Sequence, residues 1–139
     1  KDGRPGKDKS GKLIDSRRLY LSAIMGTRKG EDGKNIVWGW NRIASVTSRF
    51  QPKYNETLFD ARYSLADCRY RYALTKVGEE KTKYLGYAKK EILNTHKLYP
   101  LMGGEQLKDR SNRLLKTVQR NLKEKETGLP STTSGASTN

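Results

Sequence analysis

The sequence of 139 residues contains a single cysteine, a single histidine and no long apolar run. One cysteine, Cys68, excludes a disulfide within the chain and a cysteine-based zinc site. One histidine, His96, excludes a histidine-rich metal site. No apolar stretch approaches the roughly 20 residues that a membrane-spanning helix needs. We therefore expect no bound metal, no cofactor and no membrane span.

Acidic residues are scarce relative to basic ones. The chain has 29 Lys and Arg against 15 Asp and Glu, which gives a formal net charge of +14. Such a surplus favours acidic partners: nucleic acid, an anionic membrane surface, acidic polymers or the acidic face of a protein. Only 33% of the residues are hydrophobic, so we expect one domain with a core of modest size.

The residue groupings that catalysis requires are also missing. Gly26, Gly30 and Gly33 are not followed by the lysine and hydroxyl residue of a phosphate-binding loop. The acidic pair Glu31 and Asp32 lacks the other oxygen ligands and the closing glutamate of a calcium loop. The sequence suggests no nucleophilic triad and no pair of carboxylates on an apolar surface. We therefore expect a protein that is not an enzyme.

What the sequence does contain is helical periodicity, centred on the stretch ARYSLADCRYRYA at residues 61–73. Small and aromatic residues share one face there, and small residues let another helix approach closely. Cys68, in the middle of this helix, reads as a small buried side chain. One helix cannot bury so wide a face alone, so we expect the others to gather around it. The apolar surface consists of Leu58, Tyr63, Ala66, Tyr70, Tyr72 and Ala73.

Apolar residues recur at helical spacing in five stretches, which predicts an all-α fold. Asp15 and Asn55 are expected N-caps. Gly26 is expected to end the first helix, and Gly78 to close the third. At most one short hairpin is expected, near residues 29–37. The predicted helices are 15–25, 38–50, 55–76, 79–98 and 105–125.

The fourth predicted helix has its apolar stripe interrupted by charges. We expect His96 to lie beside this stripe, either packed or at the surface. After the helix, Leu101 and Met102 are expected to tuck into the core, and Gly103 and Gly104 to form the turn. The predicted stripe consists of Tyr84, Tyr87, Ala88, Ile92, Thr95 and Leu98.

Both ends of the chain are polar, so we expect three regions. Residues 1–12 read as a flexible basic arm, either a solvated tether or a segment that touches a polyanion. Residues 13–126 form the helical domain. Residues 127–139 form a serine- and threonine-rich tail, which fits a linker, an O-glycosylated stalk or a strand lent to a neighbouring molecule.

Two features fit glycosylation of an exported protein. Asn55-Glu56-Thr57 is an acceptor sequon, although a helix cap explains Asn55 better. The first residue is Lys1, so a lost export signal would be consistent with an exported or cell-surface protein. The candidate O-linked sites are Ser131, Thr132, Thr133 and Ser134.

The predicted helix 105–125 has the most basic face in the chain. Such a face is either solvated or in contact with a polyanion. Trp38 is expected to pack at a helix start, or alternatively to stack on a sugar or a base. The basic face consists of Lys108, Arg110, Arg113, Lys116, Arg120 and Lys123.

Taken in pairs, the predicted helices resemble tetratricopeptide repeats. Residues of the helices 38–50 and 79–98 have the spacing of positions 4, 7 and 8 in the first helix of that repeat. Residues of the helix 55–76 have the spacing of positions 20, 24 and 27 in its second helix. The run LYPLMGG looks like the end of bacterial tetratricopeptide arrays. The residues that carry the resemblance are Trp40, Ile43, Ala44, Ala66, Tyr70, Ala73, Tyr84, Tyr87 and Ala88.

The resemblance implies a right-handed stack of antiparallel helical hairpins with a concave face that binds peptides. Two repeats are few for a stable array, so neighbouring subunits, a longer chain or the first helix must cover the open ends. We therefore expect a protein-binding scaffold that also self-assembles into a filament or array. The alternative is a basic helical protein that binds nucleic acid. The implied groove residues are Asn41, Ser45, Ser48, Arg49 and Lys89.

Overall fold

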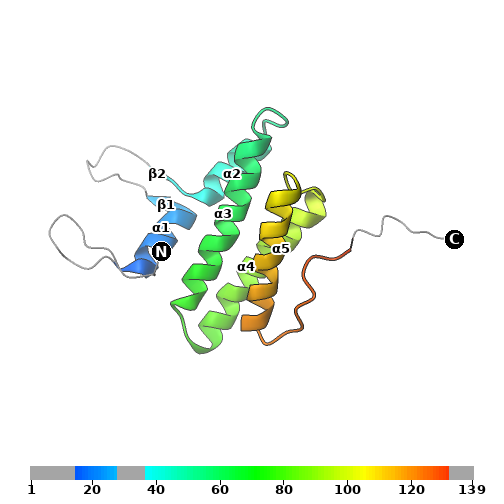
Figure 1. The fold of residues 1–139 in the computed structure, drawn as a ribbon. Coiled ribbons are helices and arrows are strands. Elements are labelled where there is room, and N and C mark those ends of the chain that lie inside the picture. Colours follow the sequence, from blue (N-terminus) through cyan, green and yellow to red (C-terminus); the bar gives the residue numbers. More distant parts are fainter. Residues whose placement is uncertain (1–14, 28–36, 132–139) are drawn as a thin grey trace.

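The computed structural model describes residues 15–27 and 37–131 of the chain. These residues form the helices α1 (Ser16–Met25), α2 (Trp40–Ser48), α3 (Asn55–Leu74), α4 (Gly78–Leu98) and α5 (Glu105–Asn121) (Figure 1). The strands β1 (Gly26–Thr27) and β2 (Val37–Trp38) form one short antiparallel pair. The all-α prediction is confirmed, and every helix bound lies within four residues of its predicted place.

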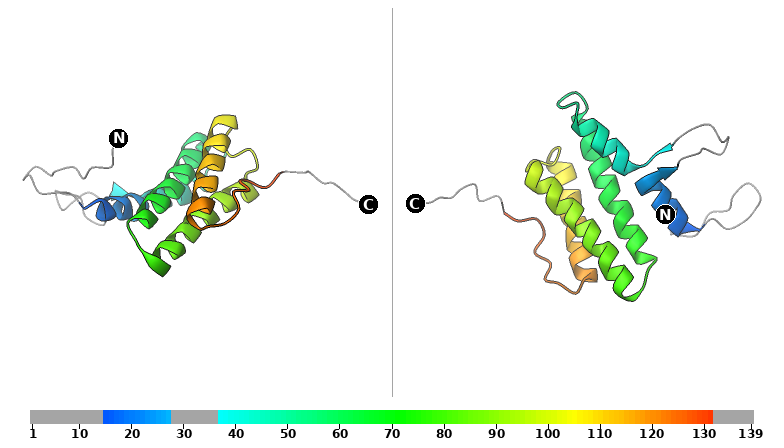
Figure 2. Two further views of the ribbon diagram at one scale, coloured as in Figure 1. Left: turned by 60° about the horizontal axis from the view of Figure 1, so that its bottom comes forward. Right: turned by 180° about the vertical axis from the view of Figure 1, so that it is seen from behind.

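α3 is the helix on which the others pack. It contacts α1, α2, α4 and α5, and it lies between α1 and α2 on one side and α4 and α5 on the other (Figures 1 and 2). Each side buries different residues of α3. Ala66 and Ala73 face the core formed with α4 and α5, Leu65 packs with α1, and Leu58 and Ala61 pack with α2. The expectation that the other helices gather around this one is confirmed.

Helix contacts follow the order of the sequence. α1 packs on α2 and α3, α2 packs on α3, α3 packs on α4 and α5, and α4 packs on α5. Each helix therefore packs mainly on the next one or two along the chain. A stack of helical hairpins produces this order, whereas a closed bundle also packs its first helix against its last.

The burial of α4 differs from its predicted stripe at three residues. Leu85 is buried at 1% exposure, whereas Tyr87 and Leu98 are 40% and 61% exposed. Ala88 and Ile92 are buried as expected. The buried row of α4 therefore contains Leu85, Ala88 and Ile92 and does not include Tyr87. Aromatic character suggested burial, but the Tyr87 ring lies at the edge of the helix, near the charged ends of Arg69 and Lys83.

The turn after α4 and two helix caps also differ in part from expectation. Met102 is buried, but Leu101 is 79% exposed. Asp15 caps α1 as predicted, because its carboxylate accepts from the Arg17 backbone N–H at 3.0 Å. Asn55 is no cap: α3 begins at this residue, and its Oδ1 is buried without a partner. Gly78, with φ +59°, starts α4 instead of ending α3.

α5 ends in a tight reversal that carries the chain back along the helix. Lys123 N–H donates to the Arg120 carbonyl at 3.0 Å, and Glu124 N–H donates to the Gln119 carbonyl at 2.9 Å. This pair of bonds is the Schellman motif, and its left-handed position is normally glycine. Here the residue is Lys123, with φ +59°.

Residues 127–131, which we call the strap, then lie beside α5 (Figure 2). The packed domain therefore extends past residue 126, where the sequence analysis places its end. The predicted arm at residues 1–12 and the tail residues Thr132, Thr133 and Ser134 lie outside the described residues.

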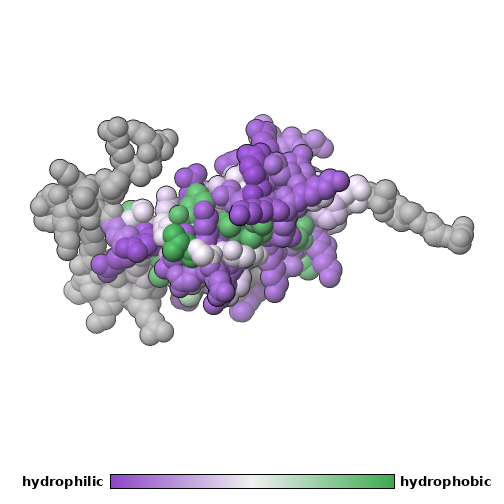
Figure 3. Space-filling view, turned by 90° about the horizontal axis from the view of Figure 1, so that it is seen from below, coloured by the Kyte–Doolittle hydropathy of each residue, from purple (hydrophilic) through white to green (hydrophobic). Residues whose placement is uncertain are grey.

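Figure 3 views the lower end of the molecule, where hydrophilic residues surround a smaller apolar region. The chain turns from α3 into α4 at this end (Figure 1). Two apolar side chains are exposed at the turn, Leu74 at 44% and Val77 at 84%. An apolar group this small is ordinary for a protein surface.

The small residues of α3 provide a first test of the fold. Ala66 is 1% exposed and lies in the core shared with α4 and α5. We expect Ala66→Leu to overpack this core and lower the free energy of unfolding by about 1–3 kcal/mol. Urea denaturation measures the change. Thr57→Leu, at an exposed position of the same helix, is the control, and equal midpoints for both variants would contradict the packing described.

The reversal after α5 provides a second test. A non-glycine residue in the left-handed region costs roughly 1–2 kcal/mol, and glycine avoids this cost. Glycine also increases the conformational entropy of the unfolded chain, so only part of that free energy is gained. We expect Lys123→Gly to raise the free energy of unfolding by about 0.5–1 kcal/mol. Lys125→Gly is the matched control, because Lys125 is exposed and has no positive φ. Destabilisation by both substitutions would argue against the left-handed conformation.

Candidate protein-binding surface

The exposed face of α4 carries three lysines at intervals of seven residues. Lys83, Lys90 and Lys97 are all exposed. Seven residues make almost two helical turns, so these side chains share one face and follow each other at roughly 10.5 Å. The partly exposed Tyr87 and the exposed Asn94 lie on the same face, between the lysines.

α3 adds two arginines beside this row, also seven residues apart. Arg62 lies 3.6 Å from the Glu91 carboxylate and 3.3 Å from the Thr95 hydroxyl. Arg69 lies 6.0 Å from the ring centre of Tyr87. The Nε atoms of both arginines are buried without a partner. We call the combined area the α3–α4 basic surface; it consists of Arg62, Arg69, Lys83, Tyr87, Lys90, Asn94 and Lys97.

A hollow of about 420 Å³ lies at the upper end of this surface. Arg62, Asn94 and Lys97 line it together with Glu91, and Leu98 forms its apolar edge. Guanidinium, amide and ammonium groups are all hydrogen-bond donors suited to a carboxylate. The hollow can therefore hold an acidic side chain of a partner, with the alkyl part against Leu98.

Tyr87 is a poor platform for stacking a nucleic-acid base. Its ring centre lies 6.0 Å from both the Arg69 guanidinium and the Lys83 ammonium. Tyr84 meets it edge-on, with ring centroids 5.6 Å apart. Because cations of the protein already flank the ring, little of its face is left for a base.

Four of the five groove residues implied by the resemblance lie on α2 or at its C-terminal end, and the fifth, Lys89, lies apart from them. Asn41, Ser45 and Arg49 are exposed on α2, and the Ser48 hydroxyl donates to the Ser45 carbonyl at 2.8 Å. Lys89 instead forms a 2.6 Å ion pair with Glu124, beyond the end of α5. α3 lies between these two places (Figures 1 and 2).

The predicted basic face of α5 is divided among several local contacts. The Arg110 guanidinium lies 4.4 Å from the ring centre of Tyr63. Arg120 pairs with Glu126 through two hydrogen bonds and lowers the pKa of that carboxyl. Lys116 lies beside Gly128 of the strap. Of the remaining members, Arg113 and Lys123 are exposed and Lys108 is half-buried.

The other predicted residues fall at separate places. Trp38 is 46% exposed, and the Arg42 guanidinium lies 4.5 Å from its ring centre. Asn55 is half-buried at the start of α3, and Ser131 is exposed at the end of the strap. Burial, and next the Asp67 carboxylate, raise the pKa of the Cys68 thiol, which keeps it in the less reactive protonated form.

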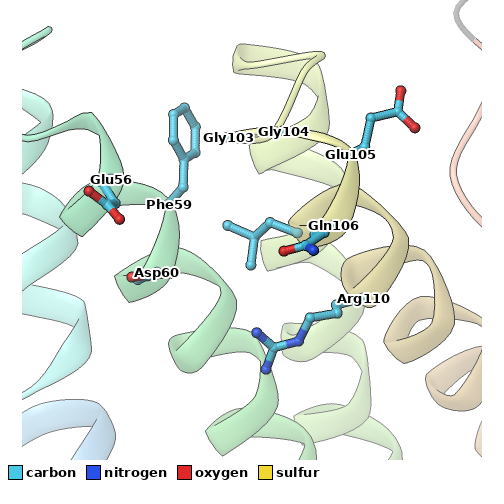
Figure 4. A pocket seen from close by; sticks show the side chains of 9 residues that line it. Glu56, Phe59, Asp60, Gly103, Gly104, Glu105, Gln106 and Arg110 are labelled. Carbon is cyan, nitrogen blue, oxygen red and sulfur yellow. The ribbon is translucent and has the colours of Figure 1, made fainter.

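A second hollow, of about 400 Å³, lies between the starts of α3 and α5 (Figure 4). Its lining residues include Glu56, Asp60, Glu105 and Arg110. Among the residues that the structure describes, no three metal-ligating side chains lie close enough to hold an ion. In the same residues, no helix is long and apolar enough to cross a membrane.

No protein-family model, no curated protein and no solved structure matches this chain.

The α3–α4 basic surface is the arrangement that sequence reasoning missed. Its signal was present, because every seventh residue from Arg62 to Lys97 is basic. The tyrosines of α4 favoured an interpretation of this helix as a packing element. The helix 105–125 has the more basic face, so the predicted basic surface was placed there. The structure makes the row meaningful because α3 and α4 run side by side.

His96 generates a pH-dependent prediction. Burial, and next the charge of Lys108, lower its pKa below the ordinary 6.5, and its Nε2 is buried without a partner. As the pH falls below about 6.5, the unfolded chain binds a proton before the folded chain does, so stability decreases. Urea midpoints at about pH 7.5 and pH 5.5 should show this loss, and His96→Gln should reduce it.

The two carboxylates with lowered pKa values, Asp15 and Glu126, cannot account for a loss in that range. The pKa values of Asp15 and Glu126 are lowered from 3.8 and 4.5, so both groups lose their proton-linked stability at more acidic pH. An equal pH slope in the wild type and the His96→Gln variant would show that His96 is not the responsible group.

Proposed function

We propose that this chain is a non-enzymatic, tetratricopeptide-like scaffold that binds an acidic segment of a protein partner across the α3–α4 basic surface. The observation that carries this proposal is the row of five cations on two adjacent helices. One of these cations, Arg62, already pairs with a carboxylate, that of Glu91 at 3.6 Å. The remaining cations have no ion-pair partner among the described residues, so they are available to a ligand.

The spacing of the lysines indicates the kind of segment that would fit. An extended peptide in the polyproline II conformation advances by about 3.1 Å per residue and returns to the same face every three residues, so roughly 10.5 Å along α4 corresponds to about three peptide residues. An extended segment with a carboxylate at about every third position would place one acid near each lysine. The hollow beside Arg62 would receive one of these side chains.

The order of the helix contacts supports the scaffold part of the proposal. Stacked hairpins expose a continuous surface along their length, which suits binding of an extended ligand. Leu21 and Met25 of α1 are 45% and 62% exposed. An uncovered apolar row of this kind supports self-association as a second part of the proposed function.

Nucleic-acid binding is the alternative, and the net charge of +14 together with the exposed Trp38 favours it. Two observations weigh against it. Arg42 already stacks on Trp38, and Arg110 and Arg120 are engaged by Tyr63 and Glu126. A polyanion would find the α5 cations partly occupied, whereas no such contact of Lys90 and Lys97 on α4 is found among the described residues.

A fluorescent poly-glutamate peptide of about 15 residues tests the proposal. We expect it to bind the wild-type chain, and Lys90→Glu combined with Lys97→Glu to weaken binding about tenfold or more. Two exposed charge pairs contribute roughly 0.2–1 kcal/mol each, and reversal adds repulsion, while about 1.4 kcal/mol corresponds to tenfold. Fluorescence anisotropy measures the dissociation constants.

Lys53→Glu combined with Lys125→Glu is the matched control, because it changes the net charge equally at exposed residues in the turn between α2 and α3 and after α5. Equal weakening by both pairs would mean that overall charge, and no particular surface, attracts the peptide. Tighter binding of single-stranded DNA, with steep salt dependence and no preference between the two variant pairs, would favour the nucleic-acid alternative.

A further inference from the structure

The outer face of α5 holds the strap through side-chain amides. Gln119 Nε2 donates to the Thr127 hydroxyl at 2.9 Å, and Gln119 Oε1 accepts from the Gly128 backbone N–H at 3.0 Å. Asn112 Oδ1 accepts from the Leu129 backbone N–H at 2.8 Å. Gln119 is only 5% exposed, so both halves of its amide are committed to the strap. Side chains of a helix thus bind the backbone of an extended segment.

The same face selects the side chains of that segment. Gly128 has φ +70°, and a Cβ there would collide with Asn112 Oδ1 and lie 2.9 Å from Lys116 Cε. Leu129 packs against the core cluster shared by α3, α4 and α5. Thr127 supplies the hydroxyl that Gln119 binds. Glycine followed by a large apolar residue is therefore required, as in a peptide-recognition site.

We propose that Asn112, Lys116 and Gln119 form a peptide-binding groove that also accepts the strap of a second copy of this chain. The contacts that hold the strap lie within three consecutive residues, so they can form equally well with a strap from another molecule. Exchange of an identical element between protomers is a low-cost route to a dimer. The inference gives the self-association part of the proposed function a specific site.

The connection between α5 and the strap favours such an exchange. It passes through Lys123, whose left-handed conformation, with φ +59°, strains the backbone of a non-glycine residue in the closed form. A strap that reaches to another molecule does not require this reversal. The closed form keeps the advantage of a high local strap concentration, so exchange increases with protein concentration.

Two full-length variants with complementary defects test the exchange. Leu129→Asp disables the strap and leaves the groove intact, whereas Gln119→Ala disables the groove and leaves the strap intact. Each variant alone should be a single chain at about 100 µM, because it lacks either a working strap or a working groove. The wild type should also stay closed at this concentration, which is well below a millimolar effective concentration. Their equimolar mixture should contain a complex with the mass of two chains, measured by size-exclusion chromatography with light scattering. The absence of that complex, or its formation by one variant alone, would overturn the exchange.

A peptide measurement tests the groove independently. A labelled peptide of residues 124–133 should bind the full-length Leu129→Asp variant at least tenfold more tightly than the wild type, whose groove is occupied. The same peptide carrying Gly128→Ala should not bind. Binding to neither protein, or binding that ignores the glycine, would refute the groove.

Circular dichroism tests whether each variant is folded. If Leu129→Asp does not fold, full-length Gly128→Ala takes its place. The Lys90→Glu and Lys97→Glu pair should leave the exchanged complex unchanged. Loss of poly-glutamate binding with intact exchange, or the reverse, therefore separates the failure of the α3–α4 surface from the failure of the groove.

Discussion

The structure depends on the enclosure of α3 by helices on both of its sides. Ala61, Ala66 and Ala73 are all at most 1% exposed, and their small side chains let neighbouring helices approach the α3 backbone closely. α1 and α2 contribute little buried surface of their own, with Ile24, Ala44 and Thr47 as their buried residues. Their position is therefore set by the surface that α3 offers, as is that of the α4–α5 pair on the other side.

The enclosure of α3 also determines which surfaces remain for binding. α4 uses the row that contains Leu85, Ala88 and Ile92 to pack inward, so its lysines at every seventh residue must face outward. α5 packs inward through Leu114, Leu115 and Val118, and its adjacent amides meet the strap. One face therefore offers a row of charges, while the other offers hydrogen-bonding amides beside an apolar core. These two chemistries suit different partners.

Most of the fold could be predicted from the sequence, because helix periodicity is a local signal, as is Gly26 at the end of α1. The five helices and the central place of residues 61–73 follow from them. The features that could not be predicted depend on contacts with residues outside the helix that carries them. Tyr87 is exposed because charged side chains offer its ring an alternative to the core. The backbone turn before α3, in which Asn55 N–H donates to the Pro52 carbonyl, removes Asn55 from the capping position. The position of the strap depends on hydrogen bonds to Asn112 and Gln119. These bonds form only because the chain reverses direction at Lys123.

The direction of the strap has a consequence for the length of the helical stack. In a regular array, the next hairpin starts directly after the second helix of the preceding one, at the end of the molecule where that helix stops. Here the chain instead returns along α5, and Ser131 lines a hollow with Glu105 and Asp109 near the beginning of that helix. The strap thus occupies part of the side of α5 where a further hairpin would add. In the proposed tetratricopeptide-like stack, a docked strap would therefore block the addition of a further hairpin on this side of α5.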